Sequence, residues 1–530
     1  MSWLNLLSFV GIFALCGIAW LTSEDRRIIP WKTIAWGIGL QLILGALVFL
    51  LPATRSLMLL LNDAVNAVLD ATEAGARFLF GPLFVPQPTE VPGPVLAGRW
   101  IARAITPPYV PVPGDRLSPD FLNLGYVFAF RALPSVIFFS ALMSLLYALG
   151  LIQPLVNLFA RLFRRTMNLS GAEALSGSAN IFVGIEATLV VRPYLERMTR
   201  SELCAILASC FGSTASTVLA LYASLLRPTF PNITGHLISA SIMAIPACFV
   251  LAKLIVPETE VPETMGKVLQ EHPSYSQDAA IAKGMESFDS GVEREDIVEE
   301  VPAALTKTAA VPQPVSRIGP SPDQEEPLEP LETPAFLAPM ESIVVGALDG
   351  LKMAGAIAAL LIAVLGLVAI INLFFTNLAS LASSSLPFFQ AIGRVFQVIT
   401  LQNIAGALFL PLTFLTGVSL KWPELWQSSV LIGQRLLLTE VPSFQQLAVL
   451  ASQGILSQRA LLVVSYALCG FAHFASVGIF VGGMISLVPA RRRDISELGW
   501  KALWAGTLAT LMIGCIAGLY DTGNPAIIGR

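Results

Sequence analysis

Gly184-Ile185-Glu186-Ala187 and, in the second half of the chain, Leu438-Thr439-Glu440-Val441-Pro442 interrupt very apolar sequence in the same way. Each is followed about one helix later by a small, polar stretch: Phe211-Gly212-Ser213-Thr214-Ala215-Ser216 in the first case, Phe471-Ala472-His473-Phe474-Ala475-Ser476 in the second. A lone carboxylate in apolar surroundings is costly and usually marks a substrate or ion site. Paired interruptions in matching halves are typical of the binding site of a secondary transporter.

The composition around these breaks is that of a membrane protein. Of the 530 residues, 55% are hydrophobic, and the mean hydropathy is +0.71. Several segments reach the roughly 20 apolar residues that cross a bilayer, which predicts an all-α polytopic protein with about eight transmembrane helices. The expected location is the plasma (inner) membrane. The spans are predicted at 4–21, 32–52, 126–150, 200–226, 236–256, 343–374, 459–488 and 498–519.

Two further apolar segments, 172–192 and 400–441, are broken by Gly, Ser, Asn and Glu, and we predict that both are re-entrant hairpins. With eight spans, three Lys/Arg clusters, at 26–32, 161–165 and 491–493, fall on one side of the membrane. The positive-inside rule makes that side cytoplasmic and places both termini outside. The hairpins then enter from opposite faces, which predicts an inverted repeat.

The chain divides into five predicted regions. Residues 258–340 carry 17 Asp/Glu against 5 Lys/Arg, and this acidic, Pro-rich segment is expected to be a disordered cytoplasmic linker. No basic run predicts a nucleic-acid partner, and the six cysteines fit small buried hydrophobes. The other regions are N-terminal transmembrane helices (1–82), an extracytoplasmic insertion (83–122), a scaffold helix, interfacial helix and first hairpin repeat (123–257), and a second hairpin repeat with the C-terminal helix (341–530).

Several stretches follow the pattern of a known family: Ala179 to Gly184, Val190 to Leu195, Met198 to Leu203, Ala467 to Ala472, and the helices at 130–153 and 499–518. On these residues, the sequence resembles the concentrative nucleoside transporter family over most of 124–256 and 343–520. The resemblance implies a homotrimer that carries nucleosides inward with sodium, or with protons in some bacterial members. It also implies an elevator-like motion of a hairpin-bearing domain against a scaffold, with no cofactor besides the coupling ion.

Glu186 and Glu440 are the predicted sugar-binding acceptors. A hydroxyl donates a short, strong hydrogen bond to a carboxylate, and both carboxylates lie at hairpin breaks next to a broken helix. The alternative is that either Glu forms a buried ion pair of the scaffold, with Arg192 or Arg435 as partner.

The first half also carries the predicted cation site. Asn180 and Ser213 match positions that the resemblance assigns to sodium ligands, and Val183 and Thr214 would add backbone carbonyls. Unwound backbone of the kind expected at 212–216 supplies such oxygens in transporters. The alternative is that the Ser and Thr hydroxyls simply donate to carbonyls of their own helix.

Three more residues complete the predicted substrate site. Phe471 and Val218 match positions of apolar contact with the nucleobase, where a ring gains stacking and burial. Ser476 matches a sugar-binding hydroxyl. Taken alone, the two apolar residues would be ordinary packing.

The sequence departs from the family pattern at three places. The first hairpin reads Gly184-Ile185-Glu186-Ala187-Thr188, one residue short and without the family's Gln, so the amide that reads a base edge is absent. The second hairpin has Thr439-Glu440-Val441-Pro442 for Asn-Glu-Phe-Val. His473 replaces a sugar-binding Asn. A neutral histidine offers one donor and one acceptor, and histidine changes charge near neutral pH.

The leading hypothesis is a sodium-coupled nucleoside symporter. A second hypothesis is a proton-coupled transporter of another sugar- or base-containing solute, using His473, Glu186 or Glu440. A third is a ligand-sensing membrane receptor that signals through the 258–340 segment. An enzyme is not expected, because the sequence has no metal cluster, nucleophile elbow or phosphate-binding glycine loop.

Overall fold

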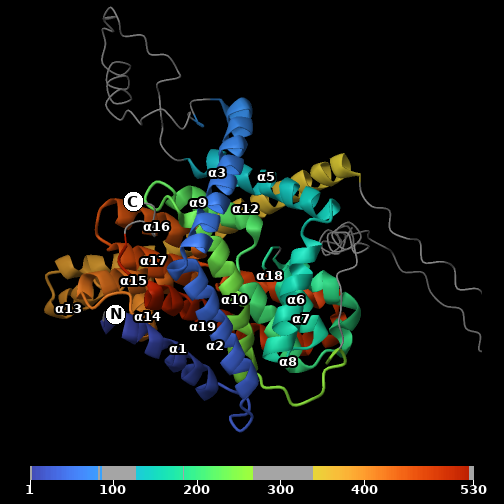
Figure 1. Cartoon of the computed structure of the whole chain (residues 1–530). Helices are drawn as coiled ribbons and strands as arrows, with labels where there is room; N and C mark the ends of the chain where they lie inside the picture. The colour runs from blue at the N-terminus through green and yellow to red at the C-terminus, as the bar shows by residue number, and fades with distance from the viewer. Residues whose placement is uncertain (1–2, 82–83, 86–126, 183, 267–337, 525–530) are drawn as a thin grey trace, which may run out of the picture. The chain divides into compact units, whose positions relative to one another are not determined.

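The computed structural model describes residues 3–81, 84–85, 127–182, 184–266 and 338–524, and every regular element in that part of the chain is a helix (Figure 1). These residues belong to one compact unit. Most of the predicted insertion at 83–122 and most of the predicted linker at 258–340 lie outside the described residues, so their predicted roles stay predictions.

Six helices in the described part are long and apolar enough to cross a membrane, or seven if one bent pair counts as a span. The protein is therefore a multi-pass membrane protein. The predicted spans 200–226 and 459–488 are not continuous, because each is divided into two shorter helices. The six are α1 (Trp3–Leu21), α2 (Trp31–Leu50), α5 (Phe128–Ala148), α10 (Ile233–Ile255), α12 (Pro339–Ser380) and α19 (Arg492–Tyr520).

Helices α5 and α12 pack side by side along a stripe of small residues (Figure 1). The buried positions of α12 include Ser342, Gly346, Gly350 and Ala354, which recur every four residues and so share one face. A Cβ on Gly350 would lie 2.7 Å from the Cα of Ile137 on α5. Such close backbone approach is how small residues join membrane helices.

The first hairpin runs through α7 (Gly171–Ala179) and the 3-10 helix η2 (Ile185–Arg197), after α6 (Gln153–Met167), the predicted interfacial helix. Capping boxes begin α7, with Ser170 and Glu173, and the following helix, with Thr199 and Glu202. These caps satisfy backbone donors that would otherwise be buried without partners. They fix where the hairpin and the broken helix start.

A buried lysine ties the hairpin to α10. The Nζ atom of Lys253 lies 2.6 Å from Glu173 and 3.0 Å from Glu258. The hydroxyl of Thr264 accepts a 3.1 Å hydrogen bond from the backbone N–H of Ala172. Through Glu258 and Thr264, the start of the predicted linker is therefore held against the folded core.

The second hairpin lies further along the chain than predicted. The segment 400–441 is not itself the hairpin, because the break at Thr439 is the turn between α15 (Trp422–Leu438) and α16 (Glu440–Ser452). The helix before it, α14 (Leu401–Leu415), packs along α15, and Gly417, with a φ of +69°, follows its C-cap residue Thr416. A bend of 59° separates α14 from α13 (Pro387–Phe396), which follows the short η3 (Leu381–Ser383).

Both broken helices follow their hairpins directly, as the sequence indicates. The first consists of α8 (Arg200–Gly212) and α9 (Ser216–Leu226), and the second of α17 (Gln458–Leu468) and α18 (Phe474–Leu487). The two N-terminal helices pack on different elements: α2 packs on α10 and α6, and α1 packs on α19 and α14. The short η4 (Pro489–Arg491) leads into α19, and α3 (Pro52–Phe80) packs on α2, α5 and α10.

Basic residues from separate parts of the chain lie at one end of the bundle. Arg200, at the start of α8, forms ion pairs with Glu24, Asp494 and Glu497. The side chain of Arg491 donates to the carbonyls of Glu196 and Met198. The loop after α1, the start of α8 and the start of α19 therefore meet at one end, which the positive-inside rule predicts to be cytoplasmic.

Candidate binding site at the two helix breaks

The two helix breaks contact each other. Gly470, in the second break, has a φ of +151°, and a Cβ there would lie 2.8 Å from the carbonyl oxygen of Gly212 in the first. The hydroxyl of Thr214 lies 3.4 Å from the Sγ atom of Cys469. Only glycine suits both this dihedral and this approach. Two segments about 260 residues apart in the sequence thus form one site.

The tip of the second hairpin has an uncommon backbone conformation. Thr439 has a φ of 78° and a ψ of 172°, a region that β-branched residues rarely adopt. Its N–H is held by the carbonyl of Arg435 at 3.1 Å. This turn makes Glu440 the first residue of α16, where the partial positive charge of a helix N-terminus favours a carboxylate. Strain of this kind concentrates at ligand sites.

Glu440 receives a donor from the opposite half of the chain. The hydroxyl of Tyr222, on α9, donates a 2.7 Å hydrogen bond to Oε1 of Glu440. Both side chains are buried. The Tyr222 ring stacks on Phe444 of α16, with centroids 4.5 Å apart and an interplanar angle of 16°. The carboxylate is therefore fixed from two sides.

His473 and Ser476 lie on the other side of the same carboxylate. The Nδ1 atom of His473 caps α18 by accepting a 3.2 Å hydrogen bond from the N–H of Ser476. The Nε2 atom lies 2.8 Å from Oε2 of Glu440, but its angles do not fit a hydrogen bond, so Oε2 is buried without an aligned donor. A ligand hydroxyl can supply the donor that this oxygen lacks.

Within the described residues, Glu440 does not form the buried ion pair with an arginine that was the alternative to a binding role. Arg435 is buried, yet its guanidinium donates to the carbonyl of Ala467 at 2.6 Å and to the hydroxyl of Thr510 at 3.0 Å. No ion pair joins Arg435 to Glu440 within the described part, and Arg192 is exposed. Arg435 instead holds α15 against α17 and α19.

The predicted apolar contacts lie close to these polar groups. Val218 is buried on α9 one turn before Tyr222, so the two share a face. Phe471 is half-buried and contacts Phe480 edge to face, with centroids 6.0 Å apart. A half-buried aromatic ring two residues from His473 keeps area that a planar base can cover.

The predicted cation ligands meet through Ser209. The Nδ2 atom of Asn180 donates to the hydroxyl of Ser209 at 3.2 Å, while Oδ1 of Asn180 is buried without a partner. Ser213 donates to the carbonyl of Ser209 at 2.7 Å, as the alternative reading of its hydroxyl predicts. That bond uses the hydrogen and leaves lone pairs on the oxygen. The carbonyl of Thr214 accepts a long, 3.4 Å bond from Ser241.

This donor set suits a hard, monovalent cation. Its members are neutral oxygens, and no group of three or more His, Cys, Asp or Glu residues that could hold a metal occurs in the described ranges. A buried amide oxygen without a partner, on a side chain that meets Ser213 through Ser209, is the kind of ligand that takes sodium in transporters. Val183 and the side chain of Glu186 lie outside the described residues, so their predicted roles stay predictions.

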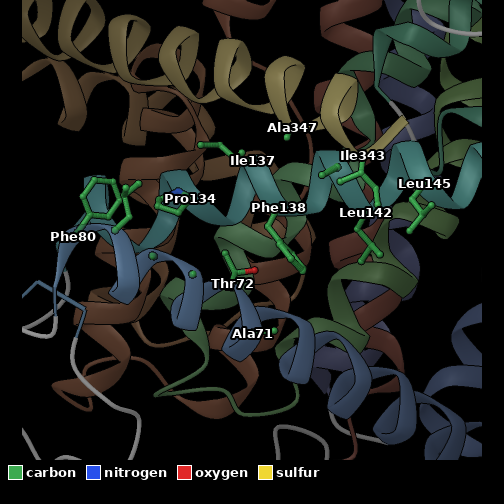
Figure 2. Close-up of a pocket in the computed structure, with 14 residues that line it drawn as sticks. Ala71, Thr72, Phe80, Pro134, Ile137, Phe138, Leu142, Leu145, Ile343 and Ala347 are labelled. Carbon is green, nitrogen blue, oxygen red and sulfur yellow. The ribbon is translucent and has the colours of Figure 1, made fainter. Parts of the chain in front are cut away.

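A separate pocket lies between α3, α5 and α12 (Figure 2). Its volume is about 510 Å³, and Phe80, Pro134, Phe138 and Ile343 line it. Its polar side chain, that of Thr72, already donates to the carbonyl of Val68. No predicted site residue lines this pocket, and a sugar or base would find few partners there.

Sequence reasoning missed Tyr222 and Ser209. Tyr222 is a lone tyrosine in an apolar half-helix, one turn beyond Val218, and that spacing was the signal available. Ser209 lies one turn before Ser213 and therefore on the same face of α8. Neither signal distinguishes a binding residue from ordinary packing without the fold.

The helical fold and the paired breaks define the class of protein as a multi-pass membrane transporter. Three family models match the chain: "Na+ dependent nucleoside transporter N-terminus" over 10–83, "Nucleoside recognition" over 129–229, and "Na+ dependent nucleoside transporter C-terminus" over 297–518. The chain belongs to the concentrative nucleoside transporter family, whose members are transporters and not enzymes.

Several relatives and solved structures match nearly the whole chain. An uncharacterized transporter of Haemophilus influenzae is 30% identical over 97% of both chains. Nucleoside permease NupC of Helicobacter pylori is 29% identical over 97% of this chain and 98% of its own. CNTnw in an inward-facing, substrate-bound state is 30% identical, with a TM-score of 0.71 over 98% of this chain and 99% of its own. A variant of CNTnw in an outward-facing state also gives a TM-score of 0.71, at 29% identity and 98% coverage of both chains.

Proposed function

We propose that this protein imports nucleosides across the plasma (inner) membrane by symport with sodium. The observation that carries the proposal is Oε2 of Glu440, a buried carboxylate oxygen without an aligned donor where the two helix breaks meet. Removing a charged acceptor from water is costly unless a donor replaces the water. The hydroxyls of a sugar are such donors.

The remaining substrate contacts follow from this anchor. Glu440, His473 and Ser476 bind the sugar, and Val218 and Phe471 flank the base. Glu186, one residue after the start of η2, is the proposed acceptor from the first hairpin. Since the family's base-reading Gln has no counterpart at 184–188, we expect broad acceptance of pyrimidine and purine nucleosides.

The cation binds the first half of the same site. Oδ1 of Asn180, the hydroxyl of Ser213 and the carbonyls of Val183 and Thr214 are the proposed ligands. Ser213 and Thr214 precede Ala215, the N-cap of α9, and α9 carries the proposed base contact Val218 and the Glu440 donor Tyr222. A cation that orders this break therefore also places α9, which couples the two binding events.

An elevator motion suits the packing. Helices α5 and α12 form a tight pair through small residues, which supports a fixed scaffold. The first transmembrane helices move with the binding site, because Asn5 donates to the carbonyl of Leu519 at 2.8 Å and Arg459 forms an ion pair with Asp521 at 3.2 Å. We extend the proposal to an inverted repeat, to a homotrimer assembled through the scaffold, and to both termini outside the cytoplasm.

Equilibrium binding to the purified protein tests this proposal. We expect uridine and adenosine to bind at least about 10-fold more tightly in sodium chloride than in potassium chloride, a typical coupling energy. Glu440→Gln should weaken binding about 100-fold, because a charge-assisted bond is lost and a neutral amide remains. The control is Glu341→Gln, an exposed position on α12. Absence of nucleoside binding in both salts would overturn the proposal.

A further inference from the structure

The hydrogen bonds around His473 determine where its proton lies. Nδ1 accepts the backbone N–H of Ser476, so it presents a lone pair and carries no hydrogen. A neutral imidazole keeps one hydrogen, which must then be on Nε2. Nε2 faces Oε2 of Glu440 at 2.8 Å and the hydroxyl of Ser476 at 2.8 Å, and both oxygens can accept.

We infer that His473 serves nucleoside binding only as a neutral imidazole, with Nδ1 capping α18 and the Nε2–H on the side of the ring that faces Ser476 Oγ and Glu440. A second proton, on Nδ1, would point at the N–H of Ser476 and break the cap. The N–H of Ser476 would then lose its acceptor, which disorders the start of α18. This inference rests on the proposed function, because it concerns how the same site binds its substrate.

The charged and titratable neighbours come from four elements. Glu440 of α16 lies beside Nε2, and His473 itself caps the N-terminal end of α18. The buried guanidinium of Arg435 belongs to α15. Tyr222 of α9 donates to Glu440, and Cys469 ends α17. The Oγ atom of Ser476 lies 3.1 Å from Nδ1 and could accept a second proton there, but the backbone N–H of Ser476 would still lose the acceptor that caps α18.

The sign of the expected pH effect separates this role from proton coupling. A proton-driven symporter that uses His473 must gain a proton there to bind its cargo, so acidification would strengthen binding. In the arrangement observed here, a proton gained at Nδ1 weakens binding.

The position of the proton can be measured without any nucleoside. The chain has three histidines, His236, His272 and His473, and the full-length protein with 15N-labelled histidine in lipid bilayers gives their nitrogen signals by solid-state NMR. The His473→Asn variant identifies the His473 signals by their loss. We expect an unprotonated Nδ1 and a protonated Nε2 at about pH 8. A protonated Nδ1 at that pH overturns the inference, whatever the substrate is.

The binding consequence is measured with uridine in sodium chloride. Between about pH 8 and about pH 5.5 we expect the wild-type Kd to rise about 10-fold, within the range that loss of a helix cap produces. His473→Asn should hold its Kd within about 2-fold over the same range, because Asn caps a helix well and does not titrate. His272→Asn is the control and should keep the wild-type profile.

The outcomes are distinct. A wild-type Kd that falls or stays constant on acidification overturns the inference, as does a His473→Asn profile that follows the wild type. If uridine binds to neither protein at either pH, the proposed function fails, and the NMR experiment alone decides the position of the proton. If the variant does not fold, a pH titration of the wild-type Nδ1 signal against uridine affinity replaces it, and the two must change together.

Discussion

The Tyr222 hydroxyl donates a 2.7 Å hydrogen bond to the carboxylate of Glu440, 218 residues further along the chain. The bond joins α9, in the first half, to the tip of the second hairpin. Substitutions in either half should therefore change the affinity for the same ligand. The contact also explains how a carboxylate can stay buried at a helix break, since a donor from the other half accompanies it.

Tyr222→Phe should weaken nucleoside binding at least about 10-fold, because a hydrogen bond to a charged group contributes about 1.5–3 kcal/mol. The ring and its stacking on Phe444 remain, but Oε1 of Glu440 loses its donor while it stays buried, so the melting temperature should fall as well. Isothermal titration with uridine measures the effect. Tyr520→Phe is the control, since that hydroxyl donates to the carbonyl of Leu42. Equal affinities for Tyr222→Phe and wild type would contradict this role.

Asn180→Leu should abolish the stabilisation of the protein by sodium. Wild-type protein should unfold about 2 °C or more higher in sodium chloride than in potassium chloride, because a ligand that binds the folded state stabilises it. The variant loses Oδ1, the buried oxygen without a partner. Asn377→Leu, at an exposed position on α12, should keep the sodium effect. A full sodium shift in Asn180→Leu would place the cation elsewhere.

Gly470→Ala should lower both thermal stability and nucleoside affinity. The added Cβ would meet the carbonyl oxygen of Gly212 at 2.8 Å, in a backbone conformation that alanine disfavours, so the two breaks must separate. Gly478→Ala, on α18, is the matched control, because a Cβ there meets nothing within 4 Å. Alanine should stabilise that helix by up to about 1 kcal/mol. Indistinguishable melting temperatures for the two variants would refute the close contact of the breaks.

Gly350→Val should separate α5 from α12 and destabilise the proposed scaffold. The added Cβ would lie 2.7 Å from the Cα of Ile137, and overpacking of this kind costs about 1–3 kcal/mol. Gly355→Val, on the same helix, carries the same helix-propensity penalty but has open space around its Cβ. Melting temperature and size-exclusion chromatography compare the two. A larger fall in melting temperature for Gly355→Val than for Gly350→Val would contradict the packing of α5 on α12 through the small residues.

The sequence predicts the paired breaks, Glu440, His473 and Ser476 because polar residues inside apolar helices have few structural uses in a membrane. The prediction places the second hairpin too early, because the break at Thr439 fits the end of a hairpin as well as the turn within one. The approach of Gly470 to Gly212 and the bond from Tyr222 to Glu440 arise only when the halves fold together. Sequence spacing carries no information about such long-range contacts.

The measurement that tests the central claim most directly is uptake of labelled uridine into proteoliposomes of the full-length protein. With an inward sodium gradient, we expect uridine to accumulate above its external concentration. Accumulation should stop when potassium replaces sodium, and both Glu440→Gln and Asn180→Leu should abolish it. A pH gradient without sodium should drive none. Accumulation that needs no sodium, or none under any gradient in protein that binds uridine, would contradict sodium-coupled import.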